Sequence, residues 1–208
     1  MNRKPGIKGL YAITPDSTDT PELLQRTRLV LSGGASVLQY RNKSADAGLR
    51  LHQATALREL TRELSVTFIV NDDAHLAAQV DADGVHLGEM DGELKAARAL
   101  LGADKIIGVS CYNQLSLAKE AVAGGADYVA FGAFYPSTVK PDTVRVGIEL
   151  LNQARVQFTV PLVAIGGITV QNAGALLDAG ADSLAVISAL FDADNCKFAA
   201  QDFSRLFN

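Results

Sequence analysis

The chain has 208 residues, of which 48% are hydrophobic and 20% are charged, and its formal net charge is −4. This composition suits one globular domain and excludes disordered and fibrous proteins. Because no block of basic residues is present, the charge argues against a protein that binds duplex DNA or RNA. No linker rich in proline, serine or charge divides the sequence, so residues 1–208 are predicted to form a single domain.

Cysteine usage and the first residues bear on the cellular compartment. Cys111 and Cys196 are too few for a disulfide framework and lack the spacing of metal ligands, which fits a reducing cytoplasm. The first 15 residues are basic but contain no apolar segment of the kind found in signal peptides. A cytoplasmic protein is therefore expected.

One uncharged stretch, residues 156–177, is 22 residues long and nominally sufficient to span a bilayer. Pro161 and the pair Gly166-Gly167 interrupt it. A buried parallel strand, a glycine turn and the start of a helix explain the stretch better, so no membrane span is predicted.

Short apolar runs alternate along the whole chain with segments of helical periodicity, such as Ala45–Leu64, whose leucines fall near one face. Several of the runs are continuously apolar, which is typical of strands covered on both faces. The predicted strands, in chain order, are Gly9–Thr14, Val37–Tyr40, Thr67–Val70, Gly84–Leu87, Ile106–Val109, Tyr128–Gly132, Leu162–Ile165 and Ser183–Ile187.

A short recurring sequence motif supports this alternation. GGAS (33–36), ADG (82–84), GGAD (124–127) and AGAD (179–182) each lie between a helical segment and a strand, where glycine suits the left-handed helix cap. Eight β-then-α units in about 200 residues predict a compact (β/α)₈ or TIM barrel. An open doubly wound sheet has the same alternation, although no GxGxxG follows the first strand as in dinucleotide-binding versions.

In such a barrel the chemistry lies just after the strands, and the first polar cluster there is Gln39, Arg41 and Lys43. These residues alternate at a strand end, so their side chains can point the same way. Two cations and an amide donor at a barrel mouth suit a diphosphate group. The alternative is an ordinary solvated strand end.

Asp72 and Asp91 end two successive strands and can share one Mg²⁺ with phosphate oxygens and water. The alternative for both is helix capping, a role that Asp73 fits better because it directly precedes a helical segment. Asn71 beside them can bond a substrate ring or an aspartate. His86 lies within an apolar run, which favours a core histidine bonded to backbone over a general base.

Four further strand ends complete the predicted site. Ser110 can donate to phosphate or simply close its strand, and Lys140 lies in a long loop that can close over substrate or be plain surface. Gly166-Gly167 and Ile187-Ser188 end the last two strands, where barrels of this class bind a phosphate monoester, and a tight strand-to-helix turn is the alternative. Two anion sites in one cleft indicate a transferase with a diphosphate leaving group.

Seven segments of the chain, in order and at similar spacing, resemble thiamine-phosphate synthases. They are LQYRNK (38–43), FIVNDD (68–73), DGVHLGEMD (83–91), IGVSCYN (107–113), GADYVAFGAFYPSTVK (125–140), AIGGI (164–168) and GADSLAVISAL (180–190). The resemblance covers essentially the whole chain. It implies a (β/α)₈ catalytic domain that joins hydroxymethylpyrimidine diphosphate to thiazole phosphate, giving thiamine phosphate and diphosphate.

The resemblance also implies residue roles. The catalytic cations are Arg41, Lys43 and Lys140, and the metal ligands for Mg²⁺ are Asp72 and Asp91. The pyrimidine-diphosphate site comprises Gln39, Tyr40, Arg41, Asn42, Lys43, Asn71, Ser110 and Lys140. The thiazole-phosphate site comprises Ser137, Thr138, Val139, Gly167, Ile187 and Ser188.

The chain departs from the family pattern at Val139, where a threonine is usual, so it lacks a hydroxyl that the resemblance would assign to a hydrogen bond with the thiazole substrate. A related branch, the thiazole tautomerases, shares the barrel, and a non-catalytic regulatory paralogue is another alternative. The synthase is favoured because the chain retains Arg41, Lys43, Asp72, Asp91 and Lys140. The expected partners are small-molecule substrates rather than nucleic acid or membrane, and a homodimer is one candidate assembly.

Overall fold

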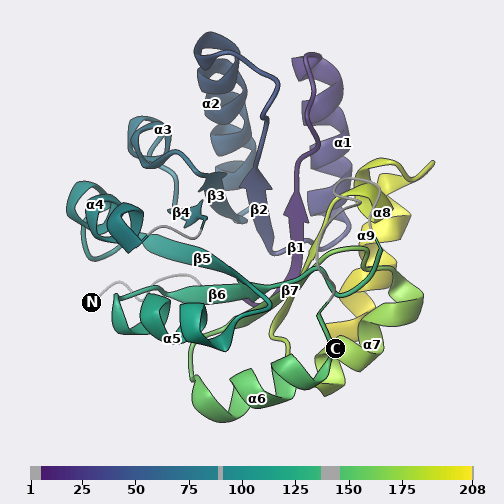
Figure 1. Ribbon diagram of the computed structural model, residues 1–208. Coiled ribbons are helices and arrows are strands. Elements are labelled where there is room, and N and C mark those ends of the chain that lie inside the picture. Colours follow the sequence, from purple (N-terminus) through teal and green to yellow (C-terminus); the bar gives the residue numbers. More distant parts are fainter. Residues whose placement is uncertain (1–5, 89–90, 137–145, 208) are drawn as a thin grey trace.

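The computed structural model describes residues 6–88, 91–136 and 146–207, and the side chains of residues 91 and 92 are also outside the description. Within these ranges eight strands pair in parallel around a closed barrel (Figure 1). They are β1 (Gly9–Ile13), β2 (Val37–Tyr40), β3 (Thr67–Asn71), β4 (Gly84–Leu87), β5 (Ile106–Tyr112), β6 (Tyr128–Phe131), β7 (Leu162–Ile165) and β8 (Ser183–Val186).

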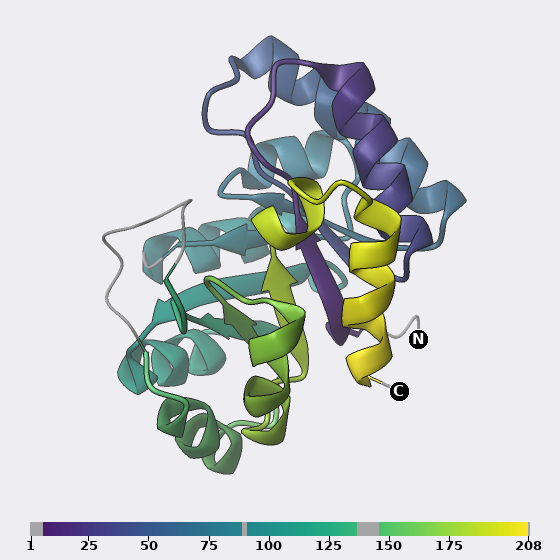
Figure 2. The same cartoon turned by 90° about the vertical axis from the view of Figure 1, so that its right-hand side faces the viewer.

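Helices follow the strands and surround the barrel, as Figure 1 shows. They are α1 (Thr20–Ser32), α2 (Ala47–Glu63), α3 (Ala74–Gln79), α4 (Asp91–Leu101), α5 (Leu115–Ala123), α6 (Glu149–Gln157), α7 (Val170–Asp178), α8 (Ser188–Phe191) and α9 (Cys196–Ser204), with a 3₁₀ turn at Arg205–Phe207. In Figure 2, α9 lies beside α1, and the close approach at Gly33 to the Lys197 carbonyl confirms that contact.

Closure of the barrel depends on the pairing of β1 with β8, which runs from Gly9 opposite Ser183 to Ala12 opposite Val186. This pairing confirms the predicted (β/α)₈ barrel and excludes the open doubly wound sheet. The strand bounds match the prediction to within a residue or so, except at β5. There the strand continues to Tyr112, with a shift of register between Ser110 and Tyr112. The prediction that β5 ends at Val109 or Ser110 was wrong. A bulge interrupts the regular alternation of side chains, so the last residues of the strand have no hydrophobic pattern that could be recognised in the sequence.

The core has two layers because strand side chains alternate between the barrel interior and the helices. The interior cluster is mostly aliphatic but includes two tyrosines: Ile7, Tyr11, Ile13, Val37, Ile69, Ile106, Tyr128, Ala130, Val163 and Ala185. A larger cluster fills the space between strands and helices, with Leu38, Phe68 and Leu184 fully buried. Burial of each such side chain stabilises the fold by about 1.5–3 kcal/mol.

A recurrent clamp fastens the N-terminal rim of the barrel. Asp83 precedes β4 and accepts from the backbone N–H of Phe68 at 2.8 Å, while both of its oxygens accept from the Arg58 guanidinium at 2.9 and 3.0 Å. A carboxylate bonded on one side to a strand and on the other to a helix ties the two layers together.

The same clamp occurs twice more along the chain. Asp127, before β6, accepts from Ile107 N and Arg98, and Asp182, before β8, accepts from Leu162 N and Arg155. These three aspartates are the acidic residues of the recurring motif, in its copies ADG, GGAD and AGAD. At the fourth copy, GGAS, Ser36 replaces the aspartate and donates to the Lys8 carbonyl.

The uncharged stretch 156–177 contains β7 and most of α7, as predicted. Among the described helices, none combines the length and the apolar character needed to cross a bilayer. Asp73 caps α3 by accepting from Leu76 N at 2.8 Å, which confirms its predicted role and leaves Asp72 outside the cap.

Candidate active site

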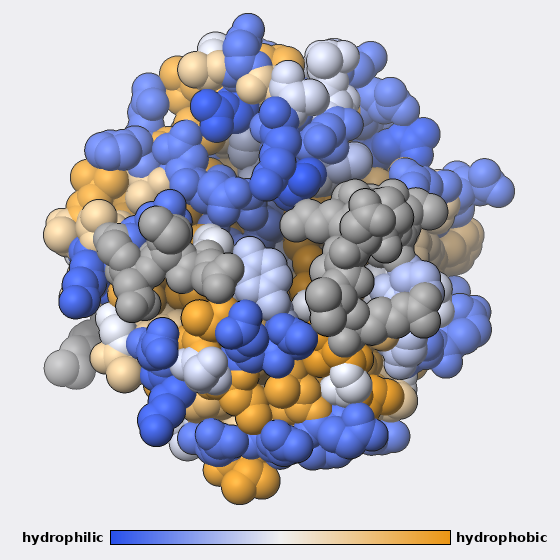
Figure 3. Space-filling model, in the orientation of Figure 1, coloured by the Kyte–Doolittle hydropathy of each residue, from blue (hydrophilic) through white to orange (hydrophobic). Residues whose placement is uncertain are grey.

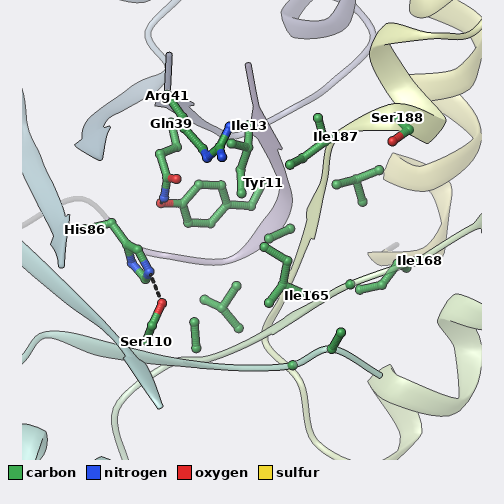
Figure 4. A pocket seen from close by; sticks show the side chains of 18 of the residues that line it. Tyr11, Ile13, Gln39, Arg41, His86, Ser110, Ile165, Ile168, Ile187 and Ser188 are labelled. Atoms are coloured by element: carbon green, nitrogen blue, oxygen red, sulfur yellow. Dashed lines mark hydrogen bonds between the residues drawn. The ribbon is translucent and has the colours of Figure 1, made fainter. Parts of the chain in front are cut away.

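A cavity of about 330 Å³ opens at the C-terminal ends of the strands. Residues from β1 to β8 and from the loops that follow them line it, and Figure 4 shows their side chains converging. This is the end of the barrel at which the sequence predicted the chemistry. The polar residues on its wall include Tyr11, Gln39, Arg41, Asn71, His86, Ser110, Tyr128, Thr169 and Ser188.

The cavity has two unlike walls. Polar side chains from β1 to β6 form one wall, where Gln39, Tyr11 and His86 lie close together in Figure 4. The opposite wall, from β7 and β8, is built largely from aliphatic side chains such as Ile165, Ile168 and Ile187. One wall therefore suits a polar heterocycle, and the other suits a flat apolar ring.

On the polar wall, five side chains form a continuous chain of hydrogen bonds. Gln39 Nε2 donates to Tyr11 Oη at 2.8 Å, and Tyr11 Oη lies 2.8 Å from Tyr128 Oη. Tyr128 Oη lies 2.9 Å from His86 Nδ1, and His86 Nε2 lies 2.9 Å from Ser110 Oγ. The His86 and Tyr128 rings also stack, with centroids 5.5 Å apart.

Burial keeps both phenols in this chain protonated. Loss of solvent raises the pKa of Tyr11, although its hydrogen bonds with Tyr128 and Gln39 act in the opposite direction. Burial also raises the pKa of Tyr128, and the nearby Tyr11 raises it further. Each phenol therefore retains one hydrogen to donate at any pH near neutrality.

Gly108 makes room for these rings in the middle of β5. It lies opposite His86 on one side and opposite Tyr128 on the other, and a Cβ at this position would overlap the Tyr128 ring. Glycine is required here by close packing inside the barrel.

The loop after β2 is held by the loop after β1. Asp16 accepts from Arg41 Nη1 at 3.0 Å and from the backbone N–H of Lys43 at 2.9 Å. Thr14 Oγ1 accepts from Arg41 N at 2.8 Å and donates to the Arg41 carbonyl. These bonds fix the Arg41 side chain, which is 16% exposed, at the edge of the cavity.

The five residues 39–43 divide between two sides of the strand. The side chains of Gln39 and Arg41 face the cavity, as their alternation predicts. The side chains of Tyr40 and Asn42 instead bond Gln53 on α2, at 2.9 and 3.0 Å, away from the cavity. Their place in the pyrimidine-diphosphate site stays a prediction, and it would be filled by their backbone atoms, because successive side chains of a strand face opposite sides.

Asp72 lies on the rim beside Asn71 and Lys43. Its backbone φ is +61°, a left-handed conformation, and its Oδ2 accepts from Asn71 Nδ2 at 2.7 Å. Lys43 Nζ is 3.8 Å from the same oxygen, and both side chains are about half exposed. The structure thus brings together three of the predicted site residues.

The remaining predicted metal ligand, Asp91, begins α4, and its side chain lies outside the described part. Among the described residues no three His, Cys, Asp or Glu side chains gather in a metal-binding group. A half-exposed carboxylate such as that of Asp72 fits Mg²⁺, which takes few protein ligands and completes its shell with phosphate and water.

The aliphatic wall ends in two backbone turns at the cavity mouth. Gly166 has φ +102° and Gly167 has φ +61°, and a Cβ at Gly167 would overlap the Pro136 carbonyl. Ile187 and Ser188 begin the turn after β8, and the side chains of both appear at the cavity in Figure 4. Ser137, Thr138, Val139 and Lys140 are outside the described residues.

Figure 3 shows how polarity is distributed over this face of the molecule. Hydrophilic residues dominate the part over α1 and α2, whereas hydrophobic residues are more frequent toward α5 and α6.

The polar residues of the site that were not predicted from the sequence include Tyr11, Tyr128 and Asp16. Asp16 follows β1 directly, so the rule that polar residues after strands line the site could have found it. The tyrosines carried no such signal because each lies within an apolar strand.

Comparison with known proteins agrees with this geometry. Residues 10–190 match the family described as thiamine monophosphate synthase. The thiamine-phosphate synthase of Methylobacillus flagellatus is 54% identical over 204 residues, covering 98% of this chain and 97% of the relative. That of Thiobacillus denitrificans is 50% identical, covering 100% of this chain and 97% of the relative. The solved thiamine phosphate pyrophosphorylase of Pyrococcus furiosus superposes with a TM-score of 0.85 at 35% identity, covering 96% and 95% of the two chains.

Proposed function

The chain belongs to the thiamine monophosphate synthase family, and from that premise we propose how its residues carry out the family's reaction. It is a transferase with the activity of a thiamine-phosphate synthase, which joins hydroxymethylpyrimidine diphosphate to thiazole phosphate and releases diphosphate. Residues 1–208 act as one catalytic domain in this proposal. A cytoplasmic location and a homodimer stay predictions.

The observation that carries the residue assignment is the position of Arg41 beside Gln39 on the polar wall. The pyrimidine ring lies between Gln39 and Ser110, and its diphosphate extends past Arg41 toward Lys43 at the rim. Arg41 chelates phosphate oxygens with two parallel N–H groups, while Lys43 supplies a point charge. Asn71 and the predicted Lys140 complete this pyrimidine-diphosphate site.

Asp72 and Asp91 would hold Mg²⁺ at the outer edge of the diphosphate. The bound ion would supply Lewis-acid stabilisation of negative charge on the departing oxygens. Asp72 is oriented for this role by Asn71, which donates to one of its oxygens and leaves the other available. Lys43 keeps the carboxylate at the side of the cavity where the cationic residues are.

The thiazole phosphate occupies the opposite side of the cavity. Its ring packs on Ile165 and Ile187, and its phosphate binds at Gly167 and Ser188, where the backbone turns leave N–H groups to donate. Ser137, Thr138 and Val139 are predicted to add contacts. This arrangement points the thiazole nitrogen across the cavity toward the methylene carbon of the pyrimidine.

The reaction then needs no side-chain nucleophile. The C–O bond to diphosphate breaks before the nitrogen attacks, because an electron-rich aminopyrimidine stabilises the methylene cation. Arg41 and Lys43 stabilise the negative charge that develops on the leaving group. The two walls hold the reacting atoms in line, which reduces the entropic cost of the encounter.

A coupling assay tests the proposed function. The purified protein is incubated with both substrates and Mg²⁺, and thiamine phosphate and diphosphate are measured. Stoichiometric formation of the two products is expected. Conversion of thiazole phosphate alone, without diphosphate release when the pyrimidine substrate is added, would instead indicate a tautomerase.

A further inference from the structure

The β7–α7 turn, which we define as residues 166–169, lines one side of the cavity. Its first two carbonyls are both bonded within the fold. The Gly166 carbonyl accepts from Tyr135 N at 3.0 Å, and the Gly167 carbonyl accepts from Asn172 Nδ2 at 3.1 Å. These two donors lie behind the turn, since neither Tyr135 nor Asn172 lines the cavity. The turn therefore directs its acceptor atoms away from a ligand.

The N–H groups of the turn face the other way. A trans peptide places its carbonyl oxygen and its N–H on opposite sides. The bonded carbonyl of Gly166 thus directs the N–H of Gly167 toward the cavity, and the bonded carbonyl of Gly167 does the same for the N–H of Ile168. Among the described residues, no acceptor bonds either N–H. Figure 4 shows Ile168 and Ser188 on the same side of the cavity, so these donors lie near the predicted phosphate site.

The side chain of Asn172 determines where this row of donors stops. Its Oδ1 accepts from Thr169 N at 2.9 Å, while its Nδ2 donates to the Gly167 carbonyl. A backbone N–H can only donate and a backbone carbonyl can only accept, so these two partners fix which end of the amide is which. The Thr169 N–H is used inside the fold, and the N–H groups of Gly167 and Ile168 are left for a ligand.

Capping of α7 does not by itself require an amide at position 172. In a capping box the third helical residue only accepts from the N-cap backbone, so an oxygen suffices. Asn195 shows the simpler case, because it caps α9 by accepting from Phe198 N at 3.1 Å. The nitrogen of Asn172 makes a further bond, to a carbonyl of the preceding turn. That bond orients the peptide whose N–H belongs to Ile168.

We propose that Asn172 is a positioning residue for the phosphate of the thiazole substrate: by holding the Gly167 carbonyl behind the turn, it makes the Ile168 N–H a donor to that phosphate. A turn that offers successive N–H groups and withholds its carbonyls attracts an anion. Tyr135 supports the arrangement, because its hydroxyl donates to the Asn172 backbone carbonyl at 3.0 Å. The inference rests on the proposed function only for the identity of the phosphate ester.

Titration with inorganic phosphate tests the direction of the N–H without either substrate. In ¹⁵N-labelled wild-type protein, the amide protons of Gly167 and Ile168 are expected to shift downfield as phosphate binds. In Asn172→Asp the carboxylate cannot donate to the Gly167 carbonyl, although it still accepts from Thr169 N. The shift at Ile168 should then be lost. A wild-type Ile168 signal that phosphate does not move, or an equal shift in both proteins, would overturn the proposal.

The contribution of the phosphate to binding is measured by calorimetry, as the ratio of dissociation constants for the thiazole alcohol and the thiazole phosphate. Asn172→Asp is expected to lower this ratio at least about tenfold, because one hydrogen bond to a charged group is lost. Asn195→Asp is the matched control: it makes the same substitution at the cap of α9 and should leave the ratio unchanged. An unchanged ratio in Asn172→Asp would overturn the proposal.

An uncharged variant separates the lost donor from the added negative charge. Asn172→Ala removes the donor to the Gly167 carbonyl and should lower the ratio to a similar extent, whereas Asn195→Ala should not. A fall in Asn172→Asp that Asn172→Ala does not reproduce would be an effect of charge alone, and would overturn the proposal. If Asn172→Asp does not fold, Asn172→Ala decides the question.

These outcomes distinguish this inference from the proposed function. Coupling activity together with an unchanged ratio in both Asn172 variants would sink the positioning role and leave the proposed function standing. A ratio that falls in both variants, in a protein that binds thiazole phosphate but does not couple it, would do the reverse.

Discussion

The two rims of the barrel use charged residues in opposite ways. At the N-terminal rim, Asp83, Asp127 and Asp182 are each bonded both to a strand N–H and to an arginine of a helix. At the C-terminal rim, Asp16 and Asp72 hold Arg41 and Lys43 at the edge of a cavity. At the N-terminal rim the charged groups bond one another and the backbone, and so stabilise the fold. At the C-terminal rim the charged groups are positioned to bind a ligand.

The largest expected effect is at Arg41. Arg41→Ala should reduce kcat/KM for coupling about 100- to 1000-fold, because it removes a two-pronged donor to the leaving group. The melting temperature should change little, since among the described residues the side chain bonds a carboxylate at the rim. Steady-state kinetics and calorimetry on the same preparation measure both. A large fall in melting temperature would place Arg41 with the structural charges of the other rim.

Asp72 and Asp73 are adjacent residues with different roles, and they form a matched pair. Asp72→Ala should lower Mg²⁺-dependent turnover about 100-fold, because it removes a predicted metal ligand. Asp73→Ala should leave turnover intact but cost about 1 kcal/mol of stability through loss of the α3 cap. Titration of activity with Mg²⁺ and urea unfolding separate these effects. Normal turnover in Asp72→Ala would exclude it as a ligand.

At the N-terminal rim, Asp83→Ala should lower the free energy of unfolding by about 3 kcal/mol. It leaves the largely buried Arg58 guanidinium and the Phe68 N–H without their carboxylate. For a chain of this size the melting temperature falls by about 6–12 °C. The kcat per folded molecule should not change. A loss of kcat at full stability would contradict the division between the rims.

The smallest expected effect is on the pH dependence of stability, and it comes from Cys111 on β5. Burial raises the pKa of the Cys111 thiol to about 12 from a usual value of 9.0. Above pH 9 the unfolded chain releases this proton and the folded chain does not, so the free energy of unfolding falls as pH rises, by about 1.4 kcal/mol per pH unit. Cys111→Ala should remove that slope between pH 9 and 10, as measured by urea unfolding. An identical slope in both proteins would mean that water reaches the thiol.

The sequence predicted the parts of the fold that depend on local pattern. Continuous apolar runs located the strands, and Asp73 was separated from Asp72 by its position before a helix. His86 was predicted as a buried histidine bonded to backbone. Its burial was confirmed, and it bonds the side chains of Tyr128 and Ser110.

The row of hydrogen bonds from Gln39 to Ser110 shows why the remaining part of the site was not predictable from the sequence. Tyr11 and Tyr128 are 117 residues apart and meet only because the barrel closes and sets the level of each strand around it. Within their own strands they look like ordinary core residues. The sequence showed the clamp aspartates only as part of a recurring motif. Their ion pairs were not predicted, because the partner arginines lie on helices 25 to 29 residues earlier in the chain.

Gly108 has a consequence of its own for how this protein can diversify. Because it contributes no side chain, the neighbouring phenol and imidazole share the floor of the cavity. A methyl group at Gly108 would overlap the Tyr128 ring and force it to move, which would leave a shallower and less polar cavity floor. The depth at which a substrate ring can settle is therefore set by one hydrogen atom, on a residue that no ligand needs to touch.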